Sequence, residues 1–394
     1  MNSGRQESFR AAAIREGFDE VRFASAEAVP AFHAGRFGEW LERGMHADMA
    51  WLERSREKRL DPSKVLAGVR SIVALGINYW PGEDRARSQR TWAKYALYKD
   101  YHDTVEAALK RLGRVLEQMF GVGSGDYRYY VDTGPVLERG VAARCGLGFQ
   151  GKNGMLISRR HGNWLFLACL LTRLPFEPDP PLPGGSGGAG SVGQFCGTCR
   201  RCIDACPTDA IPEPGLVESR RCISYQTIEN KGCIPRELRP LIGERLFGCD
   251  ICLDVCPWNR FARSGRLLLL ESQYFLADLT LLDILGMSRE RFAELFRRSP
   301  VKRLKWRGLM RNACVVAGNV TGLDPEVRAS LLDALEGLAR CDEPLVRAHA
   351  VWAIHRLTAG GRSERRLRVL REKETDPVVL EEYAHAFSGR GSQG

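Results

Sequence analysis

The sequence lacks several features that would place it in large classes of protein. It contains no run of about 18 apolar residues, the length that a membrane-spanning helix requires. Its opening segment, MNSGRQES, lacks the basic and then apolar order of a secretory signal. It has no G-x4-G-K-S/T loop, and no G-x-G-x-x-G turn that opens a helix after a strand. We therefore expect a cytoplasmic protein without a standard phosphate-binding loop for nucleotides.

The 13 cysteines do not indicate a disulfide-rich protein. Their number is odd, the chain has 394 residues, and eight of the cysteines belong to closely spaced runs or lie between them. Disulfide-rich domains are usually short, so a reducing compartment fits this chain better. A chain of this length exceeds what one hydrophobic core supports, which predicts two or three domains. The formal net charge of +10 is compatible with a polyanionic partner.

Two cysteine runs carry the strongest chemical signal. One, from Cys196 to Pro207, has the spacing C-x2-C-x2-C-x3-C-P, and the other, from Cys249 to Pro257, repeats its ending. In such runs three close thiolates bind one 4Fe-4S cluster, while the cysteine before the proline binds a second cluster. The expected ligands of one cluster are Cys196, Cys199, Cys202 and Cys256, and those of the other are Cys206, Cys222, Cys249 and Cys252.

Zinc is the main alternative for these runs, because C-x2-C pairs also suit a tetrahedral zinc ion. Zinc ribbons do not call for two C-x2-C-x3-C-P endings, so two iron-sulfur clusters are favoured over zinc or over unligated thiols. The other cysteines are isolated in the sequence, and we expect them to be small hydrophobic core residues. These are Cys145, Cys169, Cys233, Cys314 and Cys341.

Strand and helix patterns alternate in the first part of the chain. The strand-like segments are 21–24, 71–79, 127–131 and 164–171. Residues 104–120 carry apolar residues at helical spacing. The alternation predicts an α/β or α+β domain at residues 1–174. Because the Pro- and Gly-rich stretch 175–194 sustains neither period, it marks a boundary, and the cysteine runs form a second domain at 175–265.

The last part of the chain, residues 266–394, reads as helical and repetitive. We expect helical units at 306–320, 344–357 and 377–387. The last two open on an acidic residue and a proline, and Pro344 and Pro377 are 33 residues apart. A period in the thirties predicts HEAT-like stacking, in which each unit buries its apolar face against its neighbours. An ordinary helical bundle is the alternative.

Asp132 lies where a strand pattern gives way to a helix pattern, just before Gly134 and Pro135. The carboxyl ends of strands often carry working residues in open sheets. Capping of the following helix is the more ordinary role for an aspartate or threonine at such a place. Further on, a glycine-rich turn leads to Lys152 and Asn153, whose donors could reach a ligand or face solvent.

One basic segment contains no acidic residue. Residues 297–311 hold seven lysines and arginines with a tryptophan among them, a composition that can neutralise phosphates and stack on a base. A solvated helix face is the alternative interpretation of such a charge run. The candidate nucleic-acid residues are Arg297, Arg298, Lys302, Arg303, Lys305, Trp306, Arg307 and Arg311.

Taken in order, these motifs resemble epoxyqueuosine reductase, a family of cobalamin-dependent iron-sulfur enzymes that complete queuosine in transfer RNA. The resemblance covers nearly the whole chain and departs from the family pattern at Gln150, at Gln226 and in the long insertion before Cys196. The order and spacing of the motifs carry it. They are Lys58-Arg59 with Asp61-Pro62, Lys99 to His102, Val131 to Gly134, Glu138-Arg139, Lys152-Asn153, both cysteine runs, Arg221 to Tyr225 and Arg311 to Ala313.

The resemblance implies an α+β protein with an N-terminal α/β cobalamin-binding domain, a ferredoxin-like two-cluster domain and an all-α HEAT-like C-terminal domain. It implies that cobalamin binds base-off beside the nearer cluster, and that Asp132 donates a proton while the epoxide is reduced to an alkene. Burial against the corrin ring would favour the protonated carboxyl that this step needs. The implied cobalamin-pocket residues are Arg59, Asp132, Lys152, Asn153 and Asp250.

The expected substrate is epoxyqueuosine at the wobble position of transfer RNA, in a loop whose single-stranded bases are accessible. We expect a monomer that takes electrons from an external donor. Reductive dehalogenation is an alternative that uses similar cofactors, although the basic C-terminal part and the missing export signal argue against it. A nucleic-acid-binding scaffold with purely structural clusters is a third possibility, and it would bind no cobalamin.

Overall fold

The computed structural model describes residues 3–83, 91–184, 191–267, 272–358 and 361–388. They form two compact units, each assembled from separate stretches of the chain. The first unit comprises residues 3–83, 98–184, 191–222, 250–267 and 272–273, and the second comprises residues 91–97, 223–249, 274–358 and 361–388. The three consecutive domains 1–174, 175–265 and 266–394 therefore stay a prediction.

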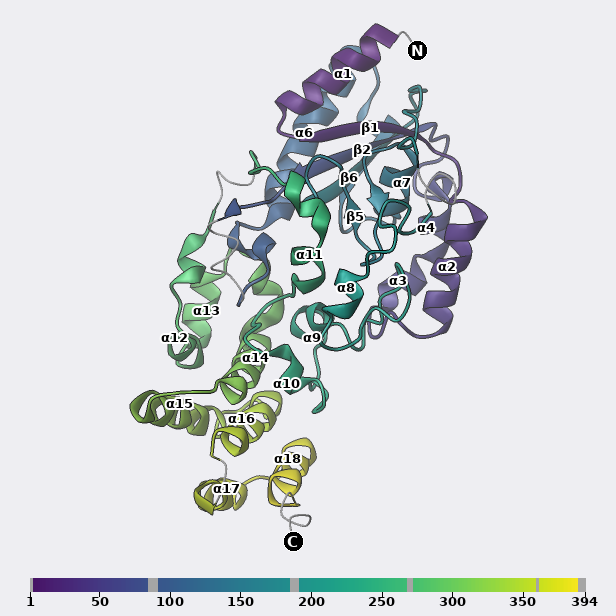
Figure 1. The fold of residues 1–394 in the computed structure, drawn as a ribbon. Helices are drawn as coiled ribbons and strands as arrows, with labels where there is room; N and C mark the ends of the chain where they lie inside the picture. Colours follow the sequence, from purple (N-terminus) through teal and green to yellow (C-terminus); the bar gives the residue numbers. More distant parts are fainter. Residues whose placement is uncertain (1–2, 84–90, 185–190, 268–271, 359–360, 389–394) are drawn as a thin grey trace. The chain divides into compact units, whose positions relative to one another are not determined.

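The first unit is built on a sheet with the strand order β1-β2-β6-β3, of which β1, β2 and β6 are labelled in Figure 1. Its strands are β1 (Glu20–Ser25), β2 (Ser71–Asn78), β3 (Tyr127–Val131) and β6 (Leu165–Thr172). Val73 of β2 lies opposite Phe23 on one side and Leu170 on the other. Every residue of β2 is buried, as its apolar and β-branched composition predicts. All these pairings are antiparallel, which supports the α+β class and corrects the α/β description of this part.

Helices cover both faces of this sheet. They are α1 (Ser3–Arg15), α6 (Tyr101–Phe120) and α7 (Glu138–Arg144). The ring of Phe9 in α1 lies 6.5 Å from that of Phe23 in β1 and 6.0 Å from that of Phe120 in α6. Ala24, the next residue of β1, belongs to the buried cluster that contains Val141 of α7. Because neighbouring strand residues point to opposite faces, α7 lies on the face away from α1 and α6.

Short elements complete the first unit, and two of the predicted cluster ligands, Cys202 and Cys252, lie within them. They are α2 (Ala31–Glu42), α3 (Ala50–Arg54), α4 (Arg56–Leu60), η1 (Pro62–Lys64), η3 (Ser124–Asp126), β4 (Phe149–Gln150), β5 (Leu156–Ile157), α8 (Arg201–Asp204), α11 (Ile251–Asp254) and η4 (Pro257–Phe261). Each of the two cysteine runs includes one short helix, α8 or α11, and these two helices contact each other. The cysteines are therefore presented on tight turns, where several side chains can face one point.

The second unit is helical in its described residues. Its elements are η2 (Lys94–Leu97), α9 (Ile223–Ile228), α10 (Arg239–Ile242), η6 (Tyr274–Ala277), α12 (Leu281–Leu285), α13 (Arg289–Leu295), η7 (Pro300–Leu304), α14 (Lys305–Asn319), α15 (Pro325–Leu338), α16 (Pro344–Leu357), α17 (Gly361–Arg371) and α18 (Pro377–Ser388). The three helical units predicted from periodicity correspond to α14, α16 and α18. α16 packs against α14, α15 and α18, so its apolar face is buried between neighbouring helices.

The loop after β3 differs from the predicted helix-capping arrangement. α7 begins at Glu138, later than Pro135, and Leu137 occupies its N-cap position without a side-chain hydrogen bond. Asp132 instead has a φ of 58°, in the left-handed region that non-glycine residues rarely adopt. Its carboxyl group does not cap α7, and the capping interpretation is wrong. Such backbone strain at an exposed polar residue is frequent at functional sites.

The isolated cysteines divide by position. Cys145, Cys169 and Cys314 are buried, as predicted for small core residues, and Cys341 is partly buried. Cys233 is exposed, which corrects the prediction for that residue.

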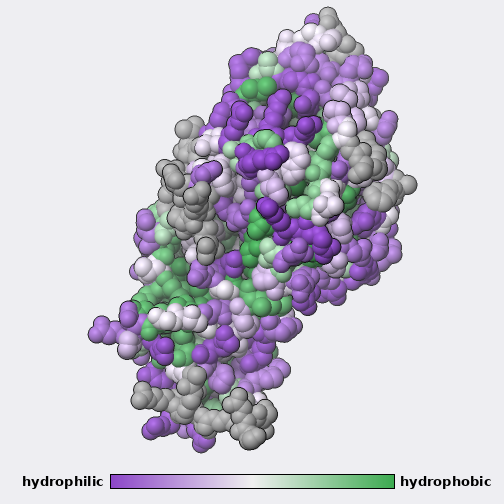
Figure 2. Space-filling view, in the orientation of Figure 1, coloured by the Kyte–Doolittle hydropathy of each residue, from purple (hydrophilic) through white to green (hydrophobic). Residues whose placement is uncertain are grey.

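In the described residues, no helix is both long enough and apolar enough to cross a lipid bilayer. The face drawn in Figure 2 is largely hydrophilic, with smaller hydrophobic areas between the polar side chains.

Candidate functional site

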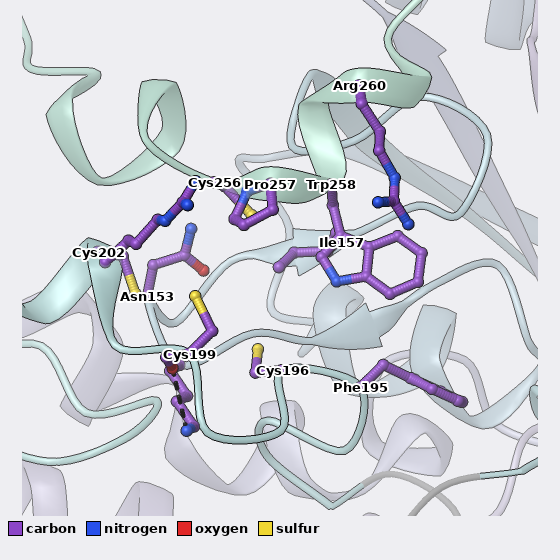
Figure 3. Close-up of a pocket in the computed structure, with 12 residues that line it drawn as sticks. Asn153, Ile157, Phe195, Cys196, Cys199, Cys202, Cys256, Pro257, Trp258 and Arg260 are labelled. Atoms are coloured by element: carbon purple, nitrogen blue, oxygen red, sulfur yellow. Dashed lines mark hydrogen bonds between the residues drawn. The ribbon is translucent and has the colours of Figure 1, made fainter.

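Four cysteines surround one cavity in the first unit. Cys196, Cys199 and Cys202 come from the first run and Cys256 from the second, and their side chains point toward the same space in Figure 3. The cavity has a volume of about 260 Å³. In the described part of the chain, no three His, Cys, Asp or Glu side chains gather as closely as one metal ion requires. Four thiols around one space are the donor set that a 4Fe-4S cluster takes.

Backbone hydrogen bonds give the first cysteine run its shape. The N–H of Cys199 donates to the carbonyl of Cys196 at 3.0 Å, and the N–H of Cys206 donates to the carbonyl of Ile203 at 3.2 Å. Burial raises the pKa of Cys202 to about 11 and also raises that of Cys196. Without a metal these groups would be neutral, unreactive thiols, whereas a bound metal deprotonates its thiol ligands.

The turn that follows the glycine-rich segment lies directly against these loops. Lys152 and Asn153 both line the cavity. The buried Asn153 donates from Nδ2 to Oδ1 of Asn163 at 2.9 Å and to the carbonyl of Cys252 at 3.4 Å. Asn163 in turn donates to Oδ1 of Asn259 at 3.2 Å. This chain of amides ties the sheet-bearing part of the unit to the second cysteine run.

The other predicted ligand set is divided between the units. Cys206, Cys222 and Cys252 belong to the first unit, and Cys249 ends a stretch of the second. The sulfur of Cys206 accepts a hydrogen bond from the backbone N–H of Ala210 at 3.3 Å, a contact that would stabilise a thiolate ligand. Binding of a second cluster by these four residues stays a prediction.

Asp132 presents its carboxyl group to solvent, with 63% of the side chain exposed. The hydroxyl of Tyr101 donates to Oδ2 of Asp132 at 2.7 Å, and Nε2 of His102 lies 3.9 Å from the same oxygen. The ring of Tyr101 is stacked against Phe166 of β6, with centroids 3.9 Å apart. The first turn of α6 therefore positions the carboxyl group. The motif Lys99 to His102 was the only sequence signal for this pair.

Glu138 is a second carboxyl group near Asp132, which sequence reasoning did not select as a site residue. Its Oε1 atom is buried and has no hydrogen-bond partner among the described residues. Burial and, less strongly, the charge of Asp132 raise the pKa of Glu138 to about 8, against the opposing charges of Arg59 and Arg139. Glu138 is therefore largely protonated at neutral pH. Arg59 also donates from Nη1 to the carbonyl of Val136 at 3.1 Å, which anchors the loop between the two carboxyl groups.

The residues predicted for a cobalamin pocket fall into separate groups. Arg59 accompanies Asp132, whereas Lys152 and Asn153 line the cysteine cavity. Asp250 precedes α11 and is not among the residues that line this cavity. The contact of these five residues with cobalamin stays a prediction.

The basic segment of the second unit contains both exposed and buried cations. Six of its cations are exposed, namely Arg297, Arg298, Lys302, Arg303, Lys305 and Arg307. Arg311 is 0% exposed, and its guanidinium donates to the carbonyls of Gln226, Asn230 and Gly232 at 2.7 to 2.8 Å. The prediction that Arg311 contacts nucleic acid is wrong, because its donors are already used inside the protein.

Trp306 has contacts that argue against base stacking. It packs against the core of the second unit and donates from Nε1 to the carbonyl of Met287 at 2.7 Å. The guanidinium of Arg289 lies 4.8 Å from the centroid of its ring. Arg303, although exposed, pairs with Glu229 at 2.8 Å, so part of the positive charge in this segment is compensated.

Two family models match the regions that carry these sites. Residues 195–259 match the 4Fe-4S double cluster binding domain, which spans all eight predicted ligands. Residues 59–133 match the model described as epoxyqueuosine reductase QueG, DUF1730, which includes Arg59 and Asp132. An epoxyqueuosine reductase of Cyclobacterium marinum is 40% identical over 304 residues, covering 76% of this chain and 93% of the relative. The chain belongs to the epoxyqueuosine reductase family.

Further epoxyqueuosine reductases support this assignment. The Pseudomonas aeruginosa protein is 35% identical over 346 residues, covering 86% of this chain and 91% of its own. A crystal structure of epoxyqueuosine reductase with a tRNA-Tyr epoxyqueuosine-modified stem loop matches with a TM-score of 0.83 and 29% identity, over 97% of this chain and 98% of that one. The Streptococcus thermophilus enzyme matches with a TM-score of 0.80 and 26% identity, over 98% and 99%. The predicted oxidoreductase with iron-sulfur clusters is confirmed, against the dehalogenase and scaffold alternatives.

Proposed function

We propose that this protein reduces epoxyqueuosine to queuosine at the wobble position of transfer RNA in the cytosol, with cobalamin and two 4Fe-4S clusters. The observation that carries the proposal is that one compact unit contains both the four-cysteine cavity and the exposed Asp132 carboxyl group. A reductive reaction needs both an electron route and a proton donor. Membership of the epoxyqueuosine reductase family supports the choice of substrate.

The overall reaction sets what the protein must supply. Conversion of the epoxide to an alkene breaks two carbon-oxygen bonds, consumes two electrons and two protons, and releases the oxygen as water. Each cluster passes one electron at a time, so electrons from an external donor enter the site singly. When bound, cobalamin supplies a low-valent cobalt centre that protein side chains cannot provide. In our proposal Asp132 donates a proton to the departing oxygen, while Tyr101 holds the carboxyl group in place.

The residues around Asp132 fit a corrinoid by their polar chemistry. The exposed carboxyl group of Asp132 can interact with amide groups like those at the rim of a corrin ring. So can the buried Oε1 of Glu138, which has no hydrogen-bond partner among the residues that the structure describes. We propose that Arg59 and Asp132 hold the corrinoid on this side. Lys152, Asn153 and Asp250 complete the proposed binding set nearer to the cluster.

The exposed cations of the second unit are the proposed contact with transfer RNA. Lys302, Lys305 and Arg307 lie in or beside η7 and α14, and exposed cations of this kind bind phosphates without sequence preference. A related reductase has been crystallised with a modified tRNA stem loop, which supports RNA as the partner. We further propose that α14 to α18 form HEAT-like repeats, that the domains divide near residues 174 and 265, and that the protein acts as a monomer.

One anaerobic assay tests the function. Protein reconstituted with iron, sulfide and cobalamin is incubated with epoxyqueuosine-containing transfer RNA and a strong reductant, and the nucleosides are then analysed. Queuosine is expected only in the complete mixture. A variant Asp132→Asn should retain both clusters and cobalamin and lose turnover by at least about 100-fold, since it can no longer donate a proton.

Two outcomes would overturn parts of the proposal. Wild-type turnover by Asp132→Asn would remove Asp132 from the mechanism. Failure of fully loaded wild-type protein to form queuosine, together with rapid reduction of a halogenated phenol, would restore the dehalogenase alternative. Tight binding of RNA by a protein that takes up no cobalamin would instead favour the scaffold.

A further inference from the structure

Lys152 makes an unusually direct set of contacts with the first cysteine run. Its ammonium donates to the carbonyl of Gly197 at 2.7 Å and to the carbonyl of Cys199 at 3.1 Å. The ammonium thus contacts the backbone of one predicted ligand, Cys199, and of the glycine that follows another, Cys196.

The rest of the turn holds this lysine in place. The carbonyl of Lys152 accepts a hydrogen bond from the N–H of Gly215 at 2.8 Å. The side chain also passes close to Gly193, where an added Cβ would lie 3.1 Å from Cγ of Lys152. Because Lys152 is half-buried and is fixed at both its backbone and its ammonium, its charge stays at a defined place beside the cavity.

The charges that line the cavity all have one sign. Besides the four cysteines, its lining includes Lys152, Arg201 and Arg260, and no aspartate or glutamate is among the described lining residues. Arg201 and Arg260 are exposed, so solvent and salt weaken their influence. Lys152 is shielded from solvent more than they are. Of these three cations, it should therefore act most strongly on a group in the cavity.

A 4Fe-4S cluster with four thiolate ligands is an anion, and reduction adds one more negative charge. A fixed positive charge nearby stabilises the reduced form more than the oxidised form, and hydrogen bonds to the ligand sulfurs act in the same direction. We propose that Lys152 is a positioning residue that raises the reduction potential of the cluster held by Cys196, Cys199, Cys202 and Cys256. This role makes the cluster easier to reduce, whatever the identity of the RNA substrate.

The proposal gives Lys152 a role at the cluster in addition to its proposed place in the cobalamin-binding set. It rests on the cluster part of the proposed function and not on the reaction with RNA. For that reason it can be tested in protein without substrate and without cobalamin, and its failure is distinguishable from failure of the turnover assay.

The test is a redox titration of cluster-loaded protein followed by electron paramagnetic resonance. Two variants separate charge from hydrogen bonding. Lys152→Gln keeps a donor and removes the charge, while Lys152→Met removes both. A matched control is Lys110→Met, an exposed lysine of α6 whose ion pair is with Glu106. Both Lys152 variants should shift the midpoint potential of one cluster to a more negative value, while the other cluster and the control keep wild-type values.

Each other outcome counts against the proposal. Wild-type potentials in Lys152→Gln and Lys152→Met would show that the charge has no influence on the cluster. A wild-type potential in Lys152→Gln alone would assign the effect to hydrogen bonding. Loss of one cluster from both variants, measured as iron per chain, would make Lys152 a structural requirement of the loop instead of a tuning group.

Discussion

Two buried ionisable groups, one in each unit, show how differently burial can be used. Arg311 in the second unit is fully buried, and its donors are met by three backbone carbonyls and by Oδ1 of Asn312. Burial lowers the pKa of Arg311 to about 10, so it remains charged at neutral pH. Glu138 in the first unit has a buried oxygen without a partner in the described residues, and its pKa is raised to about 8.

The difference separates a structural group from a functional one. A buried polar group whose hydrogen bonds are all made contributes to a unique fold, and removing it leaves its partners unsatisfied. A buried carboxyl group with an unused oxygen contributes little to stability and often marks a site for a ligand or a proton. We therefore expect substitutions at Arg311 to act on stability, and substitutions around Glu138 to act on pH dependence and turnover.

The largest expected effect is the loss of stability on substitution of Arg311. Arg311→Met should lower the free energy of unfolding by about 3–5 kcal/mol, because it leaves buried carbonyls without donors. Urea unfolding followed by circular dichroism measures it. The neighbouring exposed Arg307→Met should stay within about 0.5 kcal/mol of wild type. Equal stability of the two variants would show that the Arg311 network does not hold the second unit together.

Glu138 should produce a pH dependence that Arg311 does not. Its pKa is raised from 4.5 to about 8, so between these values the folded protein keeps a proton that the unfolded chain releases. Stability should therefore be greatest below pH 4.5 as far as this group is concerned, and decline as pH rises to about 8. The free energy of unfolding, measured at several pH values, should depend less on pH in Glu138→Gln than in the wild-type protein. An unchanged slope would mean that Glu138 is already ionised in the folded protein.

A smaller effect is expected from the tyrosine that holds Asp132. Tyr101→Phe removes one hydrogen bond to a carboxyl group on the surface, so turnover should fall by about 10-fold, equivalent to about 1.4 kcal/mol. The unfolding free energy should change much less than in Arg311→Met. Single-turnover kinetics with modified transfer RNA measure the effect. Unaltered turnover would indicate that the loop positions Asp132 without Tyr101.

The smallest expected effect concerns an exposed cation. Arg307→Met should reduce the slope of log affinity against log salt for transfer RNA by about 1, since one phosphate contact is lost. Filter binding at several salt concentrations measures this slope. Folded Arg311 variants should keep the wild-type slope, because Arg311 is buried. If Arg307→Met keeps that slope while a folded Arg311 variant loses it, the division of the basic segment by exposure is wrong.

Local pattern was sufficient for much of the fold. The strands at 71–78 and 127–131 and the helix ending at 120 follow from hydrophobic periodicity, and the cysteine spacing identified the four residues that line one cavity. Spacing succeeds there because the cysteines of one run lie a few residues apart on short turns. Other predictions depended on distant parts of the chain. Periodicity alone could not tell antiparallel from parallel pairing, or show that Asp132 caps no helix.

By itself, the sequence determined the chemistry of this protein: eight cysteines at cluster spacing, and a motif order that identifies the family. Only the tertiary structure decided which charged residues are exposed to solvent and which are buried in hydrogen-bond networks. Arg307 and Arg311 are four positions apart on one helix, yet one faces solvent and the other is enclosed by the end of α9 and the residues that follow it. The physical reason is that burial and hydrogen-bond partners come from residues far away in the chain, so a charge acquires its role only when those residues are in place.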